Sequence, residues 1–216
     1  MTDRSLLEKL QRKLGRYAIP NLMLYIVIGM AAVFVVDMVV YPVTGFSASR
    51  FLMFNRAAIL KGQVWRLLTF IFIPPNSSLL FIIFSLYFYW MIGTGLQQQW
   101  GSFRFNLFYL CGIIGSVIAG FITGATTNTY LNMSLFLAFA LIYPDFEVLL
   151  LILPIKIKWL ALIDLAMLLL MLLTETWAGR LALLVSLANV ALFFWRDGYQ
   201  TIKNAYRRYQ WKKNWR

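Results

Sequence analysis

Histidine is absent from this 216-residue chain, cysteine occurs once, and aspartate and glutamate together number only 8. A single cysteine cannot form an intramolecular disulfide, and without histidine or clustered cysteines the chain lacks the usual zinc ligands. Histidine is also the usual base that activates a serine or cysteine nucleophile, so its absence excludes the common catalytic pairs. Since no glycine-rich phosphate-binding fingerprint occurs either, we expect neither a metal nor an organic cofactor.

Charged residues are scarce: they make up 13% of the chain, whereas 61% of the residues are hydrophobic. A soluble domain averages about 25% charged and about 45–50% apolar residues, so this chain has too few polar side chains to cover a water-facing surface. The hydrophobic residues also come in long blocks, and about 20 consecutive apolar residues cross a bilayer. We therefore expect an all-α, multi-pass integral membrane protein.

The net charge is +12, and its basic residues gather near the two ends of the chain. Such positive flanks are typical of the cytoplasmic ends of membrane helices, where they also attract anionic lipid. Since no basic stretch lies away from these flanks, we expect no nucleic-acid partner. With both termini cytoplasmic, three quarters of the lysines and arginines fall inside the cell. This favours that orientation and suits a bacterial inner membrane.

The chain is predicted to have three parts. Residues 1–17 form an amphipathic basic helix on the membrane surface, residues 18–197 a six-helix transmembrane domain, and residues 198–216 a basic, aromatic cytoplasmic tail. The tail is expected to bind anionic lipid or, equally, a soluble partner. Residues 42–77 are aromatic but too interrupted to span, which predicts an interfacial loop. The predicted spans are Ala18–Tyr41, which Pro42 and Gly45 terminate, and Ser78–Leu96, Phe103–Thr123, Tyr130–Tyr143, Trp159–Leu173 and Leu181–Trp195.

The last three spans are short for a hydrocarbon layer of about 30 Å, which indicates burial in a bundle or a thinned bilayer. The third span carries Gly112, Ser116, Gly120 and Gly124 at a strict spacing of four. Small residues on one helix face let a second helix pack backbone to backbone. We interpret this ridge as a packing surface with no further role.

Asp37 and Asp164 are the only carboxylates well inside apolar blocks. An acid within a membrane is a candidate functional residue, because leaving it charged and unpaired there is costly. Nearby basic residues offer a structural explanation for both acids. We expect Asp37 to pair with Arg50 or Arg56, and Asp164 to pair with Lys158.

Three motifs occur in order along the chain: GQVWRLLTF at 62–70, GTGLQQQWGSFRF at 93–105, and AFALIYP at 138–144 followed by PIKIKWL at 154–160. Together they resemble the rhomboid proteases and their inactive relatives, the derlins. The resemblance implies a six-helix rhomboid-like bundle with an interfacial first loop. Trp65 and Arg66 would then anchor that loop, although Arg66 equally fits an arginine that extends to the membrane surface.

The second motif departs from the family at one position. The family pattern has a glutamate where this chain has Gln97, so a charge pair with Arg104 is lost. An amide keeps the shape and hydrogen-bonding capacity of the glutamate. We expect Gln97 to bond Arg104 or backbone amides.

The resemblance also implies a serine in a Gly-x-Ser-Gly motif at the start of the fourth helix and a histidine in the sixth. The ungapped serine position falls on Thr129, which has no flanking glycines, and Ser134 is the other candidate. Ser186 stands in place of the histidine. Because serine needs a base to become a nucleophile, the resemblance indicates a derlin-like pseudoprotease.

Two functions remain open from the sequence. The first is a membrane module whose partners are lipids and the transmembrane segments of client proteins, and which thins or distorts the bilayer without hydrolysis. The alternative is an intramembrane hydrolase with an unconventional site built from Ser134, Ser186 or the aspartates. A transporter ranks third, because no internal inverted repeat is apparent.

Overall fold

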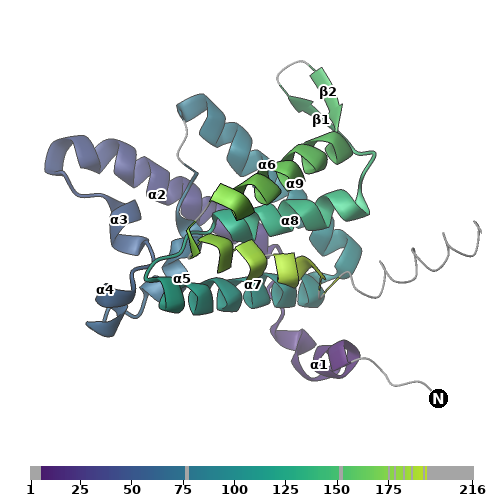
Figure 1. The fold of residues 1–216 in the computed structure, drawn as a ribbon, viewed down its shortest axis with the longest axis horizontal. Helices are drawn as coiled ribbons and strands as arrows, with labels where there is room; N and C mark the ends of the chain where they lie inside the picture. Colours follow the sequence, from purple (N-terminus) through teal and green to yellow (C-terminus); the bar gives the residue numbers. More distant parts are fainter. Residues whose placement is uncertain are drawn as a thin grey trace, which may run out of the picture.

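The structure, a computed structural model, describes residues 6–193 except 76, 77, 151, 152, 175, 178, 182, 186 and 192. The Ser186 position and the predicted tail at 198–216 lie outside the described residues. Within the described part, helices dominate (Figure 1). In chain order the elements are α1 (Leu6–Leu14), η1 (Gly15–Tyr17), α2 (Leu22–Thr44), α3 (Ala48–Leu52), α4 (Arg56–Leu60), α5 (Arg66–Thr69), η2 (Phe70–Phe72), α6 (Leu79–Trp100), α7 (Ser102–Thr123), α8 (Thr129–Ile142), β1 (Glu147–Leu150), β2 (Leu153–Lys156) and α9 (Ile157–Thr174).

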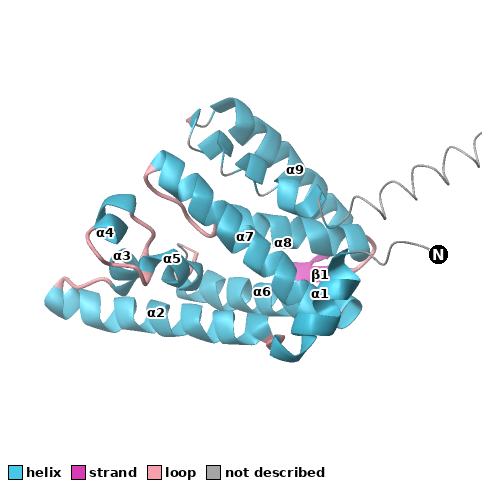
Figure 2. Ribbon diagram, turned by 90° about the horizontal axis from the view of Figure 1, so that it is seen from below, coloured by secondary structure: helices cyan, strands magenta, loops and turns pink. Residues whose placement is uncertain are grey.

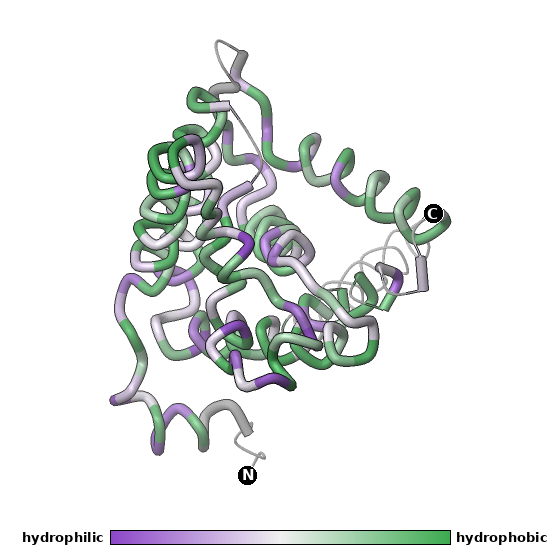
Figure 3. The backbone as a smooth tube through the Cα atoms, turned by 90° about the vertical axis from the view of Figure 1, so that its left-hand side faces the viewer, coloured by the Kyte–Doolittle hydropathy of each residue, from purple (hydrophilic) through white to green (hydrophobic). Residues whose placement is uncertain are grey.

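Four of these helices, α2, α6, α7 and α9, are long and apolar enough to cross a membrane. Two of the six predicted spans are shorter apolar helices: α8, and the described residues of Gly179–Ala191. At about 1.5 Å per residue the 14-residue α8 is about 21 Å long, below the roughly 30 Å of a bilayer core. Hydrophobic residues fill the long helices in Figure 3. The described residues therefore form a helical integral membrane protein.

The first long helix ends later than the sequence predicts. Pro42 lies within the last turn of α2 instead of terminating it, and the helix continues to Thr44. Gly45 then ends it in a left-handed conformation, with φ +70°, and donates its N–H to the Tyr41 carbonyl. Glycine adopts this conformation without a steric penalty, so Gly45 alone performs the termination expected from both residues.

The helices form a bundle in which α7 is central and α9 peripheral. In Figure 2, α2 and α9 lie at opposite edges with α6, α7 and α8 between them. In the most hydrophobic part of α7, 44% of the residues are buried, against 11% in α9. α8 packs against α6, α7 and α9, and α2 packs against α6. The largest fully buried side chains of the core include Phe54, Phe70, Phe105, Phe108, Tyr109 and Leu135.

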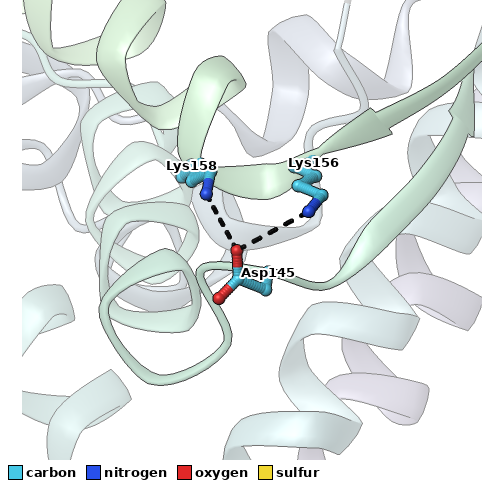
Figure 4. Close-up of polar contacts among 3 residues, drawn as sticks. All are labelled: Asp145, Lys156 and Lys158. Atoms are coloured by element: carbon cyan, nitrogen blue, oxygen red, sulfur yellow. Dashed lines mark hydrogen bonds and ion pairs between the residues drawn. The ribbon is translucent and has the colours of Figure 1, made fainter.

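A short antiparallel hairpin corrects the all-α prediction. β1 and β2 pair in a register that runs from Glu147 opposite Lys156 to Leu150 opposite Leu153. The apolar run between these polar ends is too short to cross a bilayer, and folding back on itself satisfies its backbone groups. At the base of the hairpin, the Lys158 ammonium lies 2.9 Å from the Asp145 carboxylate and lowers its pKa, and Lys156 lies 4.0 Å away (Figure 4).

Candidate functional site

Two of the positions that the resemblance assigns to catalysis, Thr129 and Ser134, lie on α8 in the described part of the chain. Thr129 is the exposed first residue of α8. Ser134 is 1% exposed, and its hydroxyl donates to the Leu131 carbonyl at 2.7 Å. A serine hydroxyl that donates its proton to a carbonyl of its own helix is not activated, because a backbone carbonyl is too weak a base to remove that proton.

Asn189, three residues after Ser186, is buried beside α7. Its Nδ2 donates to the Phe108 carbonyl at 3.2 Å, and its Oδ1 has no hydrogen-bond partner among the described residues. A Cβ added at Gly112 would lie 3.2 Å from this amide nitrogen and 3.0 Å from the Leu131 side chain. The space between α7, α8 and the described residues of Gly179–Ala191 is therefore filled, at Gly112, by the side chains of Leu131 and Asn189.

The small-residue ridge on α7 serves several neighbours rather than one helix. Gly112 lies against Leu131 of α8, whereas a Cβ at Gly120 would lie 2.6 Å from the Phe54 ring. Gly124 caps α7 with φ +97°, and its N–H donates to the Gly120 carbonyl. Packing against a second helix is therefore found at Gly112, but not at Gly120, which receives a loop side chain, or at Gly124, which lies beyond the last helical turn.

Arg66 holds together the first loop, which we define as residues 45–75. It is 9% exposed, and its guanidinium donates to the Gln63 side chain at 2.7 Å and to the carbonyls of Arg50 at 3.0 Å and Met53 at 2.7 Å. An arginine that extended to the membrane surface would instead be solvated. Trp65 is 40% exposed and stacks on Phe51 at 5.3 Å.

Asp37 joins this loop to α2, but by a route that the sequence did not predict. Its carboxylate accepts from the backbone N–H groups of Ala48, at 2.5 Å, and Ser49, at 3.2 Å. Neither Arg50 nor Arg56 pairs with it: Arg56 donates to the Phe121 carbonyl instead. The acid therefore caps the first turn of α3, where free N–H groups point outward.

Asn128 fixes the other end of the same loop, and the sequence analysis did not single it out. It is 7% exposed, and its amide donates to the carbonyls of Ile71 at 3.1 Å and Ile73 at 2.8 Å. These contacts connect residues more than fifty positions apart in the chain, so only the folded structure shows them.

Gln97 was expected to bond Arg104 or backbone amides, but it bonds a different side chain. The Gln97 amide donates to the Ser102 hydroxyl at 2.9 Å, across the turn between α6 and α7, and Arg104 is exposed. α6 ends at Trp100 and α7 begins at Ser102, so Ser102 lies closer to the last turn of α6 than Arg104 does. Gln97 therefore stabilises the helix connection without a charge.

Asp164 lies in a groove between α6 and α9 whose floor is α8. We call it the α6–α9 groove and define it by the four residues shared by its two cavities: Phe84, Phe88, Phe136 and Asp164. One cavity, of about 250 Å³, extends toward the hairpin. The other, of about 220 Å³, extends toward the start of α8. α8 packs against both walls, while α6 and α9 hardly touch each other.

The expected pairing of Asp164 with Lys158 is wrong, because Lys158 turns back to Asp145. The Oδ2 atom of Asp164 is buried and has no hydrogen-bond partner in the described part of the chain. Asn132 of α8 lines the 220 Å³ cavity too, is 5% exposed, and has an Oδ1 that likewise lacks a partner. A polar asparagine within an apolar helix was the sequence signal for this second residue.

A metal centre is not formed by the residues that the structure describes. No three of their histidine, cysteine, aspartate and glutamate side chains come together. Cys111 is partly buried in α7 as a free thiol. The groove instead offers two buried oxygen acceptors without partners among the described residues, those of Asp164 and Asn132, beside the rings of Phe84, Phe88 and Phe136.

A family model described as the Rhomboid domain matches residues 61–195. No curated protein matches the chain. The matched region begins within the first loop, extends past α9, and includes every residue that lines the two cavities of the α6–α9 groove. The chain belongs to the rhomboid family of integral membrane proteins.

Proposed function

We propose that this rhomboid-family protein binds transmembrane segments of client proteins without cleaving them. The observation that carries the proposal is the absence of histidine from the whole chain. Serine hydrolysis in a membrane needs a base within hydrogen-bonding reach of the nucleophile. The buried Ser134 hydroxyl bonds to a helix carbonyl instead.

The binding half of the proposal is supported by the α6–α9 groove. Its walls are separated helices, its floor is a short helix, and aromatic side chains line it. Within hydrocarbon, a polypeptide must satisfy its own backbone groups, so a guest between α6 and α9 would be helical. α9 also exposes most of its length, which leaves its surface available to a second helix.

A local effect on the bilayer accompanies client binding in this proposal. α8 is shorter than the hydrocarbon layer, and the first loop exposes aromatic residues such as Phe46 and Trp65, which suit the interface. A shorter path through the bilayer lowers the cost of moving a polar segment. The basic flanks favour cytoplasmic termini, in a membrane with an anionic inner leaflet such as that of a bacterium.

Activity-based labelling tests the proposal. Purified protein in lipid discs is treated with a serine-reactive fluorophosphonate, beside an active serine hydrolase as positive control. The expected result is no label on this protein, with label on the control. Labelling that disappears in Ser134→Ala or Ser186→Ala, together with cleavage of a transmembrane reporter, would establish the alternative, an intramembrane hydrolase with an unconventional site.

A further inference from the structure

Asp164 lies inside α9, a helix long and apolar enough to cross a membrane, and away from both of its ends. It is preceded in α9 by seven residues, so it lies about 10 Å along the axis of this 18-residue helix. A carboxylate at such a depth is costly unless a partner neutralises it. The ion pairs of the described residues are those that Asp145 makes with Lys156 and Lys158, and Asp164 takes part in neither.

The surroundings of Asp164 match the chemistry of a cation. Asn132 adds a second oxygen acceptor to the 220 Å³ cavity. Phe84 stacks on Phe88 at 5.9 Å between ring centroids, and Phe88 lies 5.7 Å from Phe136. Carboxylate and amide oxygens accept the several N–H donors of lysine or arginine, and aromatic faces attract the same positive charge.

We propose that the α6–α9 groove selects transmembrane helices that carry a lysine or arginine within the hydrocarbon layer, through an ion pair with Asp164. This inference rests on the proposed client-binding function and names the class of client.

Other sources of the cation fit less well. Lipid amines remain at the headgroup level, whereas Asp164 lies deeper. A second copy of this chain has no lysine or arginine within α2 or α8, and in α6, α7 and α9 its only basic residues are Arg104 and Lys158, near helix starts. Each cavity is also smaller than the roughly 300–1,000 Å³ of small-molecule sites, which suits one side chain of a guest helix.

A binding measurement with two matched peptides tests the inference. The full-length protein, donor-labelled at its amino terminus, is reconstituted into neutral phosphatidylcholine vesicles. Acceptor-labelled synthetic leucine-alanine helices carry either one central lysine or one central norleucine, and energy transfer gives each affinity. We expect the lysine helix to bind about tenfold more tightly, as for a partly solvated ion pair worth about 1.4 kcal/mol.

Variants locate the effect. Asp164→Asn keeps the side-chain shape without the charge, and it is expected to bind both helices with the affinity of the norleucine helix. Asp145→Asn removes an exposed acid outside the groove and should keep the tenfold preference. Equal binding of both helices to the unaltered protein, or a preference that survives Asp164→Asn, would overturn the inference but leave client binding intact. Binding of neither helix would overturn both proposals.

Discussion

At the start of the first loop, the backbone N–H groups of Ala48 and Ser49 donate to the carboxylate of Asp37 in α2. In the α6–α9 groove, by contrast, the Oδ2 of Asp164 is buried and has no hydrogen-bond partner among the described residues. Arg66 extends the contrast, because its hydrogen bonds to Gln63, Arg50 and Met53 all end on atoms of the loop. A buried polar group that the fold satisfies contributes to stability, and one that it leaves unsatisfied costs stability. The contrast supports the proposal that the loop is built for structure and that the groove takes a partner.

The strongest way to break the loop is Arg66→Ala. It removes three hydrogen bonds from a charged donor and leaves the Arg50 and Met53 carbonyls without this partner, so we expect a loss of about 3 kcal/mol in unfolding free energy. Denaturant titration in detergent, followed by near-UV circular dichroism, measures it. Arg104→Ala is the matched control, because this exposed arginine should matter by less than about 0.5 kcal/mol. Equal losses from both variants would contradict the assignment of Arg66 as the loop anchor.

Gly120→Ala should disturb the contact between loop and bundle. The new Cβ would lie 2.6 Å from the Phe54 ring, which packs edge-on against Phe70 and Phe121 and cannot easily move, so we expect a loss of about 2 kcal/mol. Gly112→Ala is the control, since its nearest neighbours are side-chain ends at 3.0 Å or more. Thermal unfolding compares the two variants in one detergent. A larger loss at Gly112 than at Gly120 would rule out Phe54 as the rigid contact.

Asp37→Ala should have a smaller effect, of about 1.5 kcal/mol, because it removes the cap of α3 but leaves the helices of the bundle in place. Asp37→Asn keeps an acceptor oxygen and is expected to recover part of the loss. Limited proteolysis of the first loop, alongside denaturant titration, measures the effect locally. A loop whose cleavage rate is unchanged in Asp37→Ala would show that the cap is dispensable.

The smallest effect, and one of opposite sign, is expected for Asp164→Asn. Removing an unpartnered charge from the membrane interior should leave stability unchanged or raise it by about 0.5 kcal/mol. The same titration as for Asp37→Asn gives a direct contrast between the two acids. A loss of stability comparable to that of Asp37→Ala would mean that Asp164 has an internal structural role, and the groove would then lose its distinguishing feature.

The long helices were predictable because long apolar blocks bounded by glycine and polar residues have few other solutions in a bilayer. α6, α7 and α9 accordingly begin and end within a few residues of the predicted positions. The hairpin at Glu147–Lys156 was not predicted, since its short apolar run has no alternation that would distinguish a strand from a loop.

The candidate site was only half predictable. Asp37, Asp164 and Arg66 stand out in the sequence as charges near apolar blocks, but their partners do not. Lys158 is closer to Asp164 in sequence than to Asp145, yet it bonds the latter across the hairpin base. Only the packing of α6, α8 and α9 places Phe84, Phe136 and Asp164 around common cavities.

Photocrosslinking with mass readout tests most directly whether the protein binds a transmembrane helix without cleaving it. A benzophenone amino acid replaces Met167, which lines the 250 Å³ cavity of the groove, or, as control, the exposed Val39 on α2. The protein is illuminated in vesicles with the central-lysine helix, and intact masses are measured. We predict an adduct of full peptide mass at position 167, little at position 39, and no peptide fragments. Peptide fragments that vanish in Ser134→Ala or Ser186→Ala, or no adduct at position 167, would contradict the account.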